Sequence, residues 1–337
     1  MSIEFDTQWP TQAQRQRGLL EWVKAQPRPC WLTWPGRDPS RHRVVVTLLH
    51  GNEPSGLKAL WTLMASPPQC AVTSHFCIAH LEAARLDGGF VHRHAPGRPD
   101  LNRCFGRAGL GWEYGLAHAI AERIRSLQPE AVVDLHNTSG SGPSFAVSMA
   151  DTPAHRALAS RFTERMLRTQ VRLGALMELT TPQTPIVTIE CGGAMDPASD
   201  EVARAGLRRF LADDPLLDES PGAWPLEVLH RPVRVQLAPG CRIDYGVGPV
   251  VGCDLVLPPD IEQCNFGWLD GGTELGWLGP DGLAALRLSD GLGELAVEQW
   301  FVEREGRLCL RHPGKLFMIT SNPSIALSDC LFYMVKA

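Results

Sequence analysis

Two histidine motifs stand directly after apolar runs of this sequence, and their spacing suits a metal site. His50 and Glu53 lie three residues apart in HGNEPSG, which follows the run RVVVTLL at 43–49. His136 follows the run AVVDL at 131–135. Two imidazoles and one carboxylate are a ligand set of zinc hydrolases, which leave a fourth position open for water. Together the motifs predict a zinc ion bound by His50, Glu53 and His136.

Each motif alone also has a simpler explanation. His50 could end a strand, and Glu53 could stabilise the start of a helix through its charge. Side chains alternate along a strand, however, so Asp134 would share a face with His136 and could orient its ring. In parallel α/β sheets, ligands bind beyond the carboxyl ends of strands. Two such motifs at neighbouring strand ends therefore favour the metal site.

Glu190 follows a third apolar run, in the motif IECGG. A carboxylate in a buried strand is costly unless it is paired or takes part in chemistry. Beside a metal-bound water it can accept a proton and later pass it to a leaving nitrogen. The alternative is a glutamate in a buried ion pair. Cys191 would point to the opposite face and is expected to pack in the core.

The motif DLNRCF at 100–105 lies in a long stretch, 81–111, that is rich in Gly, Pro and Arg. A loop of this length in a compact domain is usually functional or disordered. Asn102 and Arg103 side by side can grip a carboxylate, which the planar guanidinium binds through two parallel hydrogen bonds. The alternative is a loop pinned to the domain by its own Arg–Asp contacts.

The elements that must position these residues alternate between strand and helix patterns. Strands are predicted at 43–49, 74–80, 131–135 and 185–189. Helices are predicted at 57–65, 113–127, 152–168 and 197–212. This alternation predicts an α/β domain with a mostly parallel, mixed sheet.

The pattern changes after the acidic, proline-containing segment 213–225, which we interpret as a linker. Beyond it, short β-type segments are separated by Gly and Pro; they are 228–237, 248–257, 285–289, 295–303 and 315–320. We therefore predict a catalytic domain over 1–213. A smaller β-rich domain over 226–337 is expected to cover the active site.

Composition sets limits on the class of protein. The chain has 337 residues, of which 44% are hydrophobic and 20% charged, and its net charge is −5. A mild negative charge argues against nucleic acid as a partner. The sequence contains no run of about 18 apolar residues, so no membrane helix is predicted. The N-terminus lacks the apolar core of a secretory signal. The ten cysteines include no Cys-x-x-Cys pair, so reduced thiols and a cytoplasmic location are expected.

The four motifs occur in an order that resembles a known family. HGNEPSG, DLNRCF, DLHNTSG and IECGG are similar to the motifs of the succinylglutamate desuccinylase/aspartoacylase family, whose catalytic domain resembles the zinc carboxypeptidases. The resemblance implies one zinc ion per chain, held by His50, Glu53 and His136. It also implies a general base at Glu190 and a substrate carboxylate held by Asn102 and Arg103. A further arginine steadies the polarised carbonyl in this family, and here it is assigned to Arg93, with Arg98 as the alternative.

Two departures from the family pattern concern substrate choice. Aspartoacylase has an arginine shortly before the catalytic glutamate, whereas the stretch 176–190 contains none. It also uses a tyrosine of the C-terminal domain, and none of the three tyrosines, Tyr114, Tyr245 and Tyr333, lies in an obviously matching segment. The resemblance therefore predicts hydrolysis of the amide bond of a small, carboxylate-bearing N-acyl amino acid without identifying it. A carboxypeptidase acting on short peptides, an esterase and a non-catalytic zinc-binding protein are the alternatives, and a homo-oligomer is left open.

Overall fold

The computed structural model describes residues 3–138, 140–218, 225–328 and 330–336. Its chain forms two compact units. Unit 1 consists of Met1–Asn137, Ser144–Met166 and Arg172–Val228, and unit 2 of Thr138–Pro143, Leu167–Val171 and Leu229–Ala337. Within the described ranges, no helix has the length and apolar character needed to span a membrane.

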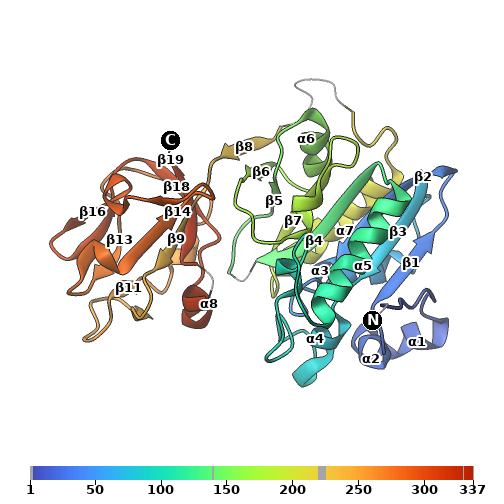
Figure 1. Cartoon of the computed structure of the whole chain (residues 1–337), viewed down its shortest axis with the longest axis horizontal. Coiled ribbons are helices and arrows are strands. Elements are labelled where there is room, and N and C mark those ends of the chain that lie inside the picture. The colour runs from blue at the N-terminus through green and yellow to red at the C-terminus, as the bar shows by residue number, and fades with distance from the viewer. Residues whose placement is uncertain (1–2, 139, 219–224, 329, 337) are drawn as a thin grey trace. The chain divides into compact units, whose positions relative to one another are not determined.

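An eight-stranded sheet in the order β1-β3-β2-β4-β7-β5-β6-β8 has most of its residues in unit 1 (Figure 1). The strands are β1 (Cys30–Trp34), β2 (Asp38–Thr47), β3 (Val72–Ile78), β4 (Ala131–Thr138), β5 (Phe145–Ser148), β6 (Arg165–Arg168), β7 (Ile186–Gly193) and β8 (Glu227–His230). Strand β2 runs parallel to both β3 and β4. Strands β1 and β5 are antiparallel to their neighbours β3 and β7. The sheet is therefore mixed, as the sequence predicted, with parallel strands at the site of interest.

Helices cover both faces of this sheet. The helices of unit 1 are α1 (Gln12–Arg17), α2 (Leu19–Ala25), α3 (Ser55–Leu63), α4 (Leu81–Arg85), α5 (Trp112–Leu127), α6 (Pro153–Ser160) and α7 (Pro197–Ala212). Because side chains alternate along a strand, Val45 joins the core that includes α3 and α7, whereas Val46 joins the core that includes α5. Helix α5 presents Leu116, Ile120 and Ile124 at four-residue spacing to this second core.

One helix ends earlier than its sequence pattern suggests. The prediction for 152–168 was wrong beyond Ser160, where α6 ends, because residues 165–168 form β6. The Thr163 hydroxyl donates to the Ser144 carbonyl at 2.8 Å and accepts the Arg165 N–H, so this N–H is satisfied outside a helix. Strand pairing then uses the backbone that follows.

Unit 2 contains two sheets around a separate apolar core. The five-stranded sheet, in the order β10-β11-β13-β17-β16, comprises β10 (Ile243–Tyr245), β11 (Leu255–Leu257), β13 (Glu274–Leu278), β17 (Arg307–Leu310) and β16 (Phe301–Arg304). The six-stranded sheet, in the order β12-β18-β19-β9-β14-β15, comprises β12 (Trp268–Leu269), β18 (Gly314–Phe317), β19 (Phe332–Lys336), β9 (Val233–Leu237), β14 (Leu286–Ser289) and β15 (Glu294–Leu295). A short helix, α8 (Pro323–Ser328), completes it. Residues 219–224 of the expected linker lie outside the described residues.

Candidate metal centre and active site

A tight turn after β2 places His50 and Glu53 together. The strand ends at Thr47, and α3 begins at Ser55. Gly51 is required here by close packing, because a Cβ atom at this position would lie 2.5 Å from the Ala84 backbone nitrogen. The turn therefore depends on the absence of a side chain, and it brings both polar side chains to the carboxyl end of β2.

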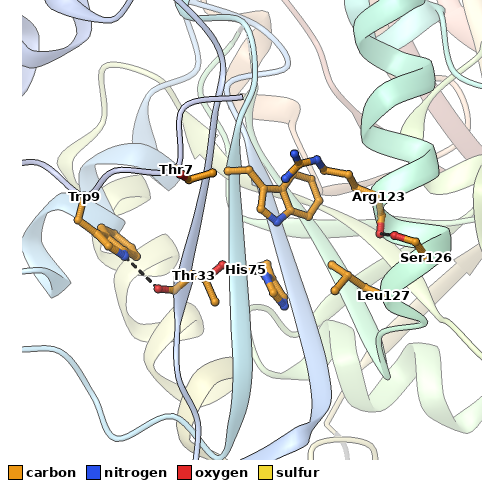
Figure 2. A pocket seen from close by; sticks show the side chains of 8 residues that line it. Thr7, Trp9, Thr33, His75, Arg123, Ser126 and Leu127 are labelled. Atoms are coloured by element: carbon orange, nitrogen blue, oxygen red, sulfur yellow. Dashed lines mark hydrogen bonds between the residues drawn. The ribbon is translucent and has the colours of Figure 1, made fainter. Parts of the chain in front are cut away.

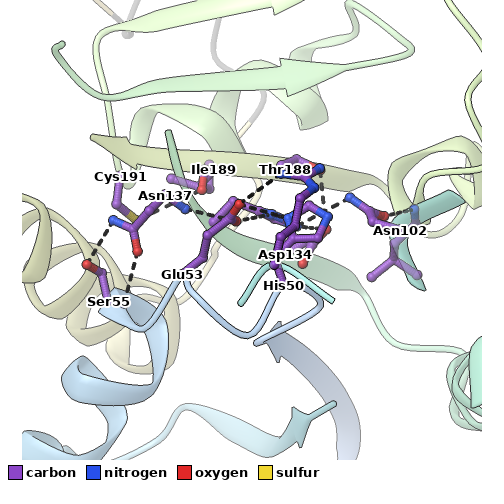
Figure 3. A network of polar contacts seen from close by, with 12 residues as sticks. His50, Glu53, Ser55, Asn102, Asp134, Asn137, Thr188, Ile189 and Cys191 are labelled. Atoms are coloured by element: carbon purple, nitrogen blue, oxygen red, sulfur yellow. Dashed lines mark hydrogen bonds and ion pairs between the residues drawn. The ribbon is translucent and has the colours of Figure 1, made fainter. Parts of the chain in front are cut away.

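His50, Glu53 and His136 form one buried cluster. Figure 3 shows His50 and Glu53 within the network of polar contacts to which the cluster belongs. His50 Nδ1 lies 2.8 Å from Glu53 Oε1, and His136 Nδ1 lies 2.6 Å from Glu53 Oε2. The two Nδ1 atoms are 3.2 Å apart. All three ligand atoms lie within 4.8 Å of one another, so the cluster could hold a metal ion.

The outer ring nitrogens of both histidines face carboxylates. His136 Nε2 lies 2.8 Å from Asp134 Oδ2, and His50 Nε2 lies 3.0 Å from Asp100 Oδ1. Hydrogen bonds of this kind place the ring proton on Nε2 and leave the Nδ1 lone pair for a metal. With both ring protons on Nε2, two lone pairs at 3.2 Å beside a carboxylate would repel one another, and a proton or a metal ion at this position removes the repulsion. The donor set and its outer partners therefore fit a divalent metal with two imidazoles and one carboxylate.

The electrostatics of the cluster follow from burial and pairing. Burial alone would raise the pKa of Glu53, but His50 and His136 hold it below its usual range. Burial would lower the pKa of His136, but Asp134 and Glu53 raise it well above its ordinary value. Strong pairing of this kind keeps the carboxylate ionised, which is the form that binds a metal.

Asn137 connects the ends of two strands and the start of a helix around the cluster. Its Nδ2 donates to Ser55 Oγ at 2.9 Å and to the Gly192 carbonyl at 3.0 Å, and its Oδ1 accepts the Ser55 N–H at 3.1 Å. Its backbone N–H donates to Glu53 Oε2 at 3.2 Å. The ends of β4 and β7 and the start of α3 are thus fixed relative to one another by one amide side chain.

Glu190 lies on β7, one strand away from His136 on β4. Burial raises the pKa of Glu190 to about 7, and the charges of His136, Glu53, His50 and Arg93 are close enough to act on it. Among the described residues, its carboxylate has no hydrogen-bond or ion-pair partner. The buried ion pair considered as an alternative is thus not formed there, and a carboxyl group with this pKa can both accept and donate a proton near neutral pH.

Asn102 is held with its amide nitrogen toward the cluster. Its Oδ1 accepts the N–H of Leu176 at 3.0 Å, and its Nδ2 lies 3.5 Å from His136 Nε2. Glu178 fixes the segment that contains Leu176, because one carboxylate oxygen accepts three consecutive N–H groups, of residues 173–175, at 2.6, 2.7 and 3.0 Å. The amide therefore presents a donor, the chemistry an anion requires.

Arg103 lies next to Asn102 in the short 3₁₀ turn Leu101–Arg103. One guanidinium nitrogen donates to the Asn102 carbonyl at 2.9 Å. The charge of Arg103 also helps to lower the pKa of Asp100, which places it near the cluster. In the part of the chain that is described, Arg103 has no carboxylate partner, so its remaining donors can bind an anion.

The structure separates the two arginines proposed for the carbonyl. Arg93 donates from Nε to Asp100 Oδ2 at 3.0 Å, and its Nη1 lies 3.3 Å from Glu53 Oε1. Arg98 donates from Nε to Glu113 Oε1 at 2.8 Å, away from these residues. Arg93 is therefore the arginine of this pair that lies at the cluster.

Two residues of the site were not assigned from the sequence. Asp100 belongs to the motif DLNRCF, and it contacts both His50 and Arg93. Burial would raise its pKa, yet His50, Arg93 and Arg103 hold it below its usual range. Asn137 belongs to the motif DLHNTSG. In both cases the signal was a polar residue beside a predicted ligand or substrate contact. Cys191 is buried in the core, as expected.

A mixed α/β sheet whose strand ends gather a His–Glu–His cluster beside an unpaired acid is typical of metal-dependent hydrolases. Residues 41–210, half of the chain, match the model of the succinylglutamate desuccinylase/aspartoacylase catalytic domain, and the chain belongs to this family. The comparison with curated proteins gave no match.

Solved structures share the fold at low sequence identity. The succinylglutamate desuccinylase of Vibrio cholerae is 15% identical over 94% of each chain, with a TM-score of 0.56. The succinylglutamate desuccinylase/aspartoacylase of Rhodobacter sphaeroides is 13% identical over 90% of this chain and 88% of that one, with a TM-score of 0.56. The product-bound ectoine utilization protein EutE (DoeB) of Ruegeria pomeroyi is 16% identical over 92% and 85%, with a TM-score of 0.54. At these identities the likeness concerns the fold alone.

Proposed function

We propose that this chain is a zinc-dependent hydrolase that cleaves the amide bond of a small N-acyl amino acid. The observation that carries the proposal is the buried His50–Glu53–His136 cluster with an unpaired carboxyl group, Glu190, beside it. Metal binding alone would not require a carboxyl group with a pKa near 7. Membership of a family named for desuccinylase and aspartoacylase activities supports hydrolysis over a purely metal-binding role.

The residues divide the chemistry among them. When bound by His50, Glu53 and His136, zinc would polarise the scissile carbonyl and make water more acidic. Glu190 accepts a proton from the attacking water and, because its pKa is about 7, can return that proton to the leaving nitrogen. The guanidinium of Arg93 would donate to the carbonyl oxygen as negative charge develops on it.

Substrate binding is assigned to the neighbouring loop. Asn102 supplies an oriented amide donor, and Arg103 supplies a guanidinium without a carboxylate partner among the described residues. A substrate carboxylate can bind both, with the planar fork of Arg103 matching its two oxygens. The stretch 176–190 contributes no arginine, so a second acidic group on the substrate has no partner there.

The test is hydrolysis of a panel of N-acetyl, N-formyl and N-succinyl amino acids, followed by detection of the released amino group. Wild-type protein should cleave at least one member, and Glu190→Gln should lower turnover by roughly 10²–10⁴-fold while zinc content is retained. Full activity of Glu190→Gln would remove the residue from the mechanism. Release of C-terminal amino acids from peptides, or cleavage of esters alone, would instead support the carboxypeptidase or the esterase.

A second comparison tests the carboxylate assignment. Arg103→Ala should lower kcat/KM by about 10–100-fold for the carboxylate substrate, and Arg103→Lys should lower it less. The loss should shrink strongly when the α-carboxylate is replaced by a carboxamide. Arg107→Lys, in the same loop, is the matched control and should have little effect. Equal losses on both substrates would show that Arg103 holds the loop and does not bind the carboxylate.

A further inference from the structure

A pocket of about 540 Å³ is lined by residues of unit 1 that do not belong to the metal centre. Figure 2 shows this pocket from close by. Its walls include Trp31 and Thr33 of β1, His75 of β3, and Arg123 and Leu127 of α5. Arg123 and Leu127 lie in the last turns of α5, whereas Trp112, the first residue of this helix, contacts His80 beyond the end of β3. The pocket is therefore at the opposite end of the helix from the catalytic end of the sheet.

Arg123 is the charged residue of this pocket, and it is half-buried. Its guanidinium carbon lies 4.6 Å from the Phe5 ring centre and 5.3 Å from that of Trp31. No carboxylate or hydrogen-bond acceptor pairs with it in the described part of the chain. By contrast, Arg125 on the same helix forms an ion pair with Glu122. A half-buried guanidinium with its donors unused is well suited to an anion.

The other polar groups of the pocket add no negative charge. His75 Nδ1 lies 3.1 Å from the Thr33 hydroxyl, and its Nε2 lies 3.2 Å from His42 Nδ1. Burial lowers the pKa of His75 to about 4, and the charges of His42 and Arg123 act in the same direction. The ring is therefore neutral at pH 7. None of the lining residues is acidic, so Arg123 gives the pocket a single positive charge.

The apolar walls are flat and already fixed. Trp9 stacks on Trp34 with ring centres 4.8 Å apart, and its indole N–H donates to the Thr33 carbonyl at 2.9 Å. Trp31 packs edge-on against Phe5. Small-molecule sites usually combine a volume of roughly 300–1,000 Å³ with aromatic walls and a few polar groups. This pocket has each of those properties.

We propose that the pocket binds a small aromatic carboxylate, whose carboxylate pairs with Arg123 and whose ring lies against Trp9, Trp31 and Leu127. An aliphatic acid would use the cation but leave the aromatic walls without a flat partner. A neutral aromatic amide would fill the walls but leave the guanidinium without an anion. The site does not depend on the proposed hydrolase activity.

Binding of benzoate to the full-length protein, measured by titration calorimetry, tests the proposal, with benzamide and acetate as matched ligands. Benzoate should bind at least 10-fold more tightly than either, because a charge-assisted hydrogen bond and the ring contacts each contribute. Arg123→Gln should remove most of the preference for benzoate over benzamide, a loss of about 10–100-fold. Arg125→Gln makes the same change of charge on the same helix and should leave benzoate binding unchanged. Thermal unfolding of each variant checks that the fold is intact.

Benzoate could also bind the active-site arginine, so Arg103→Ala is included. Benzoate binding that survives Arg103→Ala and is lost in Arg123→Gln supports this pocket. Binding that is lost in Arg103→Ala and kept in Arg123→Gln overturns the proposal, as does a protein that binds benzoate and benzamide equally or binds neither at millimolar concentration. Because hydrolysis is measured separately, failure here leaves the proposed function untouched.

Discussion

Two pairs of histidines in unit 1 have ring nitrogens at the same separation but different surroundings. His50 and His136 have Nδ1 atoms 3.2 Å apart, and His75 Nε2 lies 3.2 Å from His42 Nδ1. In the first pair, Glu53 lies between the rings and an aspartate binds each outer nitrogen. In the second, the outer partner of His75 is the Thr33 hydroxyl.

Carboxylates, rather than histidines alone, distinguish the cluster that could hold a metal ion from the second histidine pair. Asp134 and Glu53 raise the pKa of His136, so this pair attracts a cation. Burial without a carboxylate partner lowers the pKa of His75 to about 4, so this ring remains neutral at pH 7. The carboxylates of Glu53, Asp134 and Asp100 would compensate the charge of a cation between His50 and His136. A cation beside His75 would be buried without such compensation.

The largest expected effect is loss of the proposed zinc. His50→Ala and His136→Ala should each lose most of the metal from protein that otherwise carries about one zinc per chain. His75→Ala and His42→Ala serve as matched controls, and both should keep full metal content. Elemental analysis of protein purified without chelators measures the result. Zinc retained by His136→Ala, or lost from His75→Ala, would break the comparison.

Removing the outer carboxylates should have a smaller effect. Asp134→Asn and Asp100→Asn keep the shape but weaken the orientation and basicity of the ligating rings, so zinc affinity should fall about 10–100-fold. Competition with a chromogenic chelator measures it. Thr33→Val removes the partner of the control histidine and should leave zinc affinity unchanged. Unchanged affinity in both aspartate variants would mean that the cluster holds the rings without them.

The raised pKa of Glu190 predicts a pH dependence of stability in zinc-free protein. The folded chain keeps this proton between about pH 4.5 and 7, whereas the unfolded chain releases it. Stability is therefore lost as the pH rises through this window, because ionising Glu190 in the fold is costly. Glu190→Gln should be more stable than wild type by about 1–3 kcal/mol at pH 8 and equal to it near pH 4.5. Urea unfolding of both proteins in the presence of chelator, at pH 4.5 and at pH 8, measures this difference. A gain in stability of Glu190→Gln that is the same at both pH values would contradict the prediction.

The lowered pKa of His75 predicts a weaker dependence of folding stability on pH, with the opposite sign to that of Glu190. Its pKa is about 4 in the fold and about 6.5 in an unfolded chain, so the unfolded chain binds this proton first. Stability is therefore lost as the pH falls from about 6.5 to 4. His75→Gln should flatten this decline by roughly 1 kcal/mol, after allowance for partial solvent access. If urea unfolding of His75→Gln between pH 7 and 4 follows the wild-type curve, His75 is not held neutral by its surroundings.

Part of the site could be predicted because its signals are local. A histidine directly after RVVVTLL or AVVDL marks a strand end, and strand ends of a parallel sheet converge. The spacing of His50 and Glu53, and of Asp134 and His136, follows from one turn and one strand. The predicted helix at 152–168 was wrong beyond Ser160, because the Thr163 hydroxyl bonds the Ser144 carbonyl and residues 165–168 join the sheet as β6. The periodicity of apolar residues does not indicate either of these contacts.

The sequence by itself determined the types of reactive group and their attachment to strand ends, because apolar runs and the residues that follow them are properties of short segments. The tertiary structure decided which distant groups meet. Asp100 reaches His50 from 50 residues along the chain, and Arg93 reaches the cluster whereas Arg98 turns to Glu113. Composition could not separate these two arginines, since both stand in the same loop a few residues apart. Their partners depend on the path of that loop across the sheet, which is set by packing and by hydrogen bonds between segments far apart in sequence.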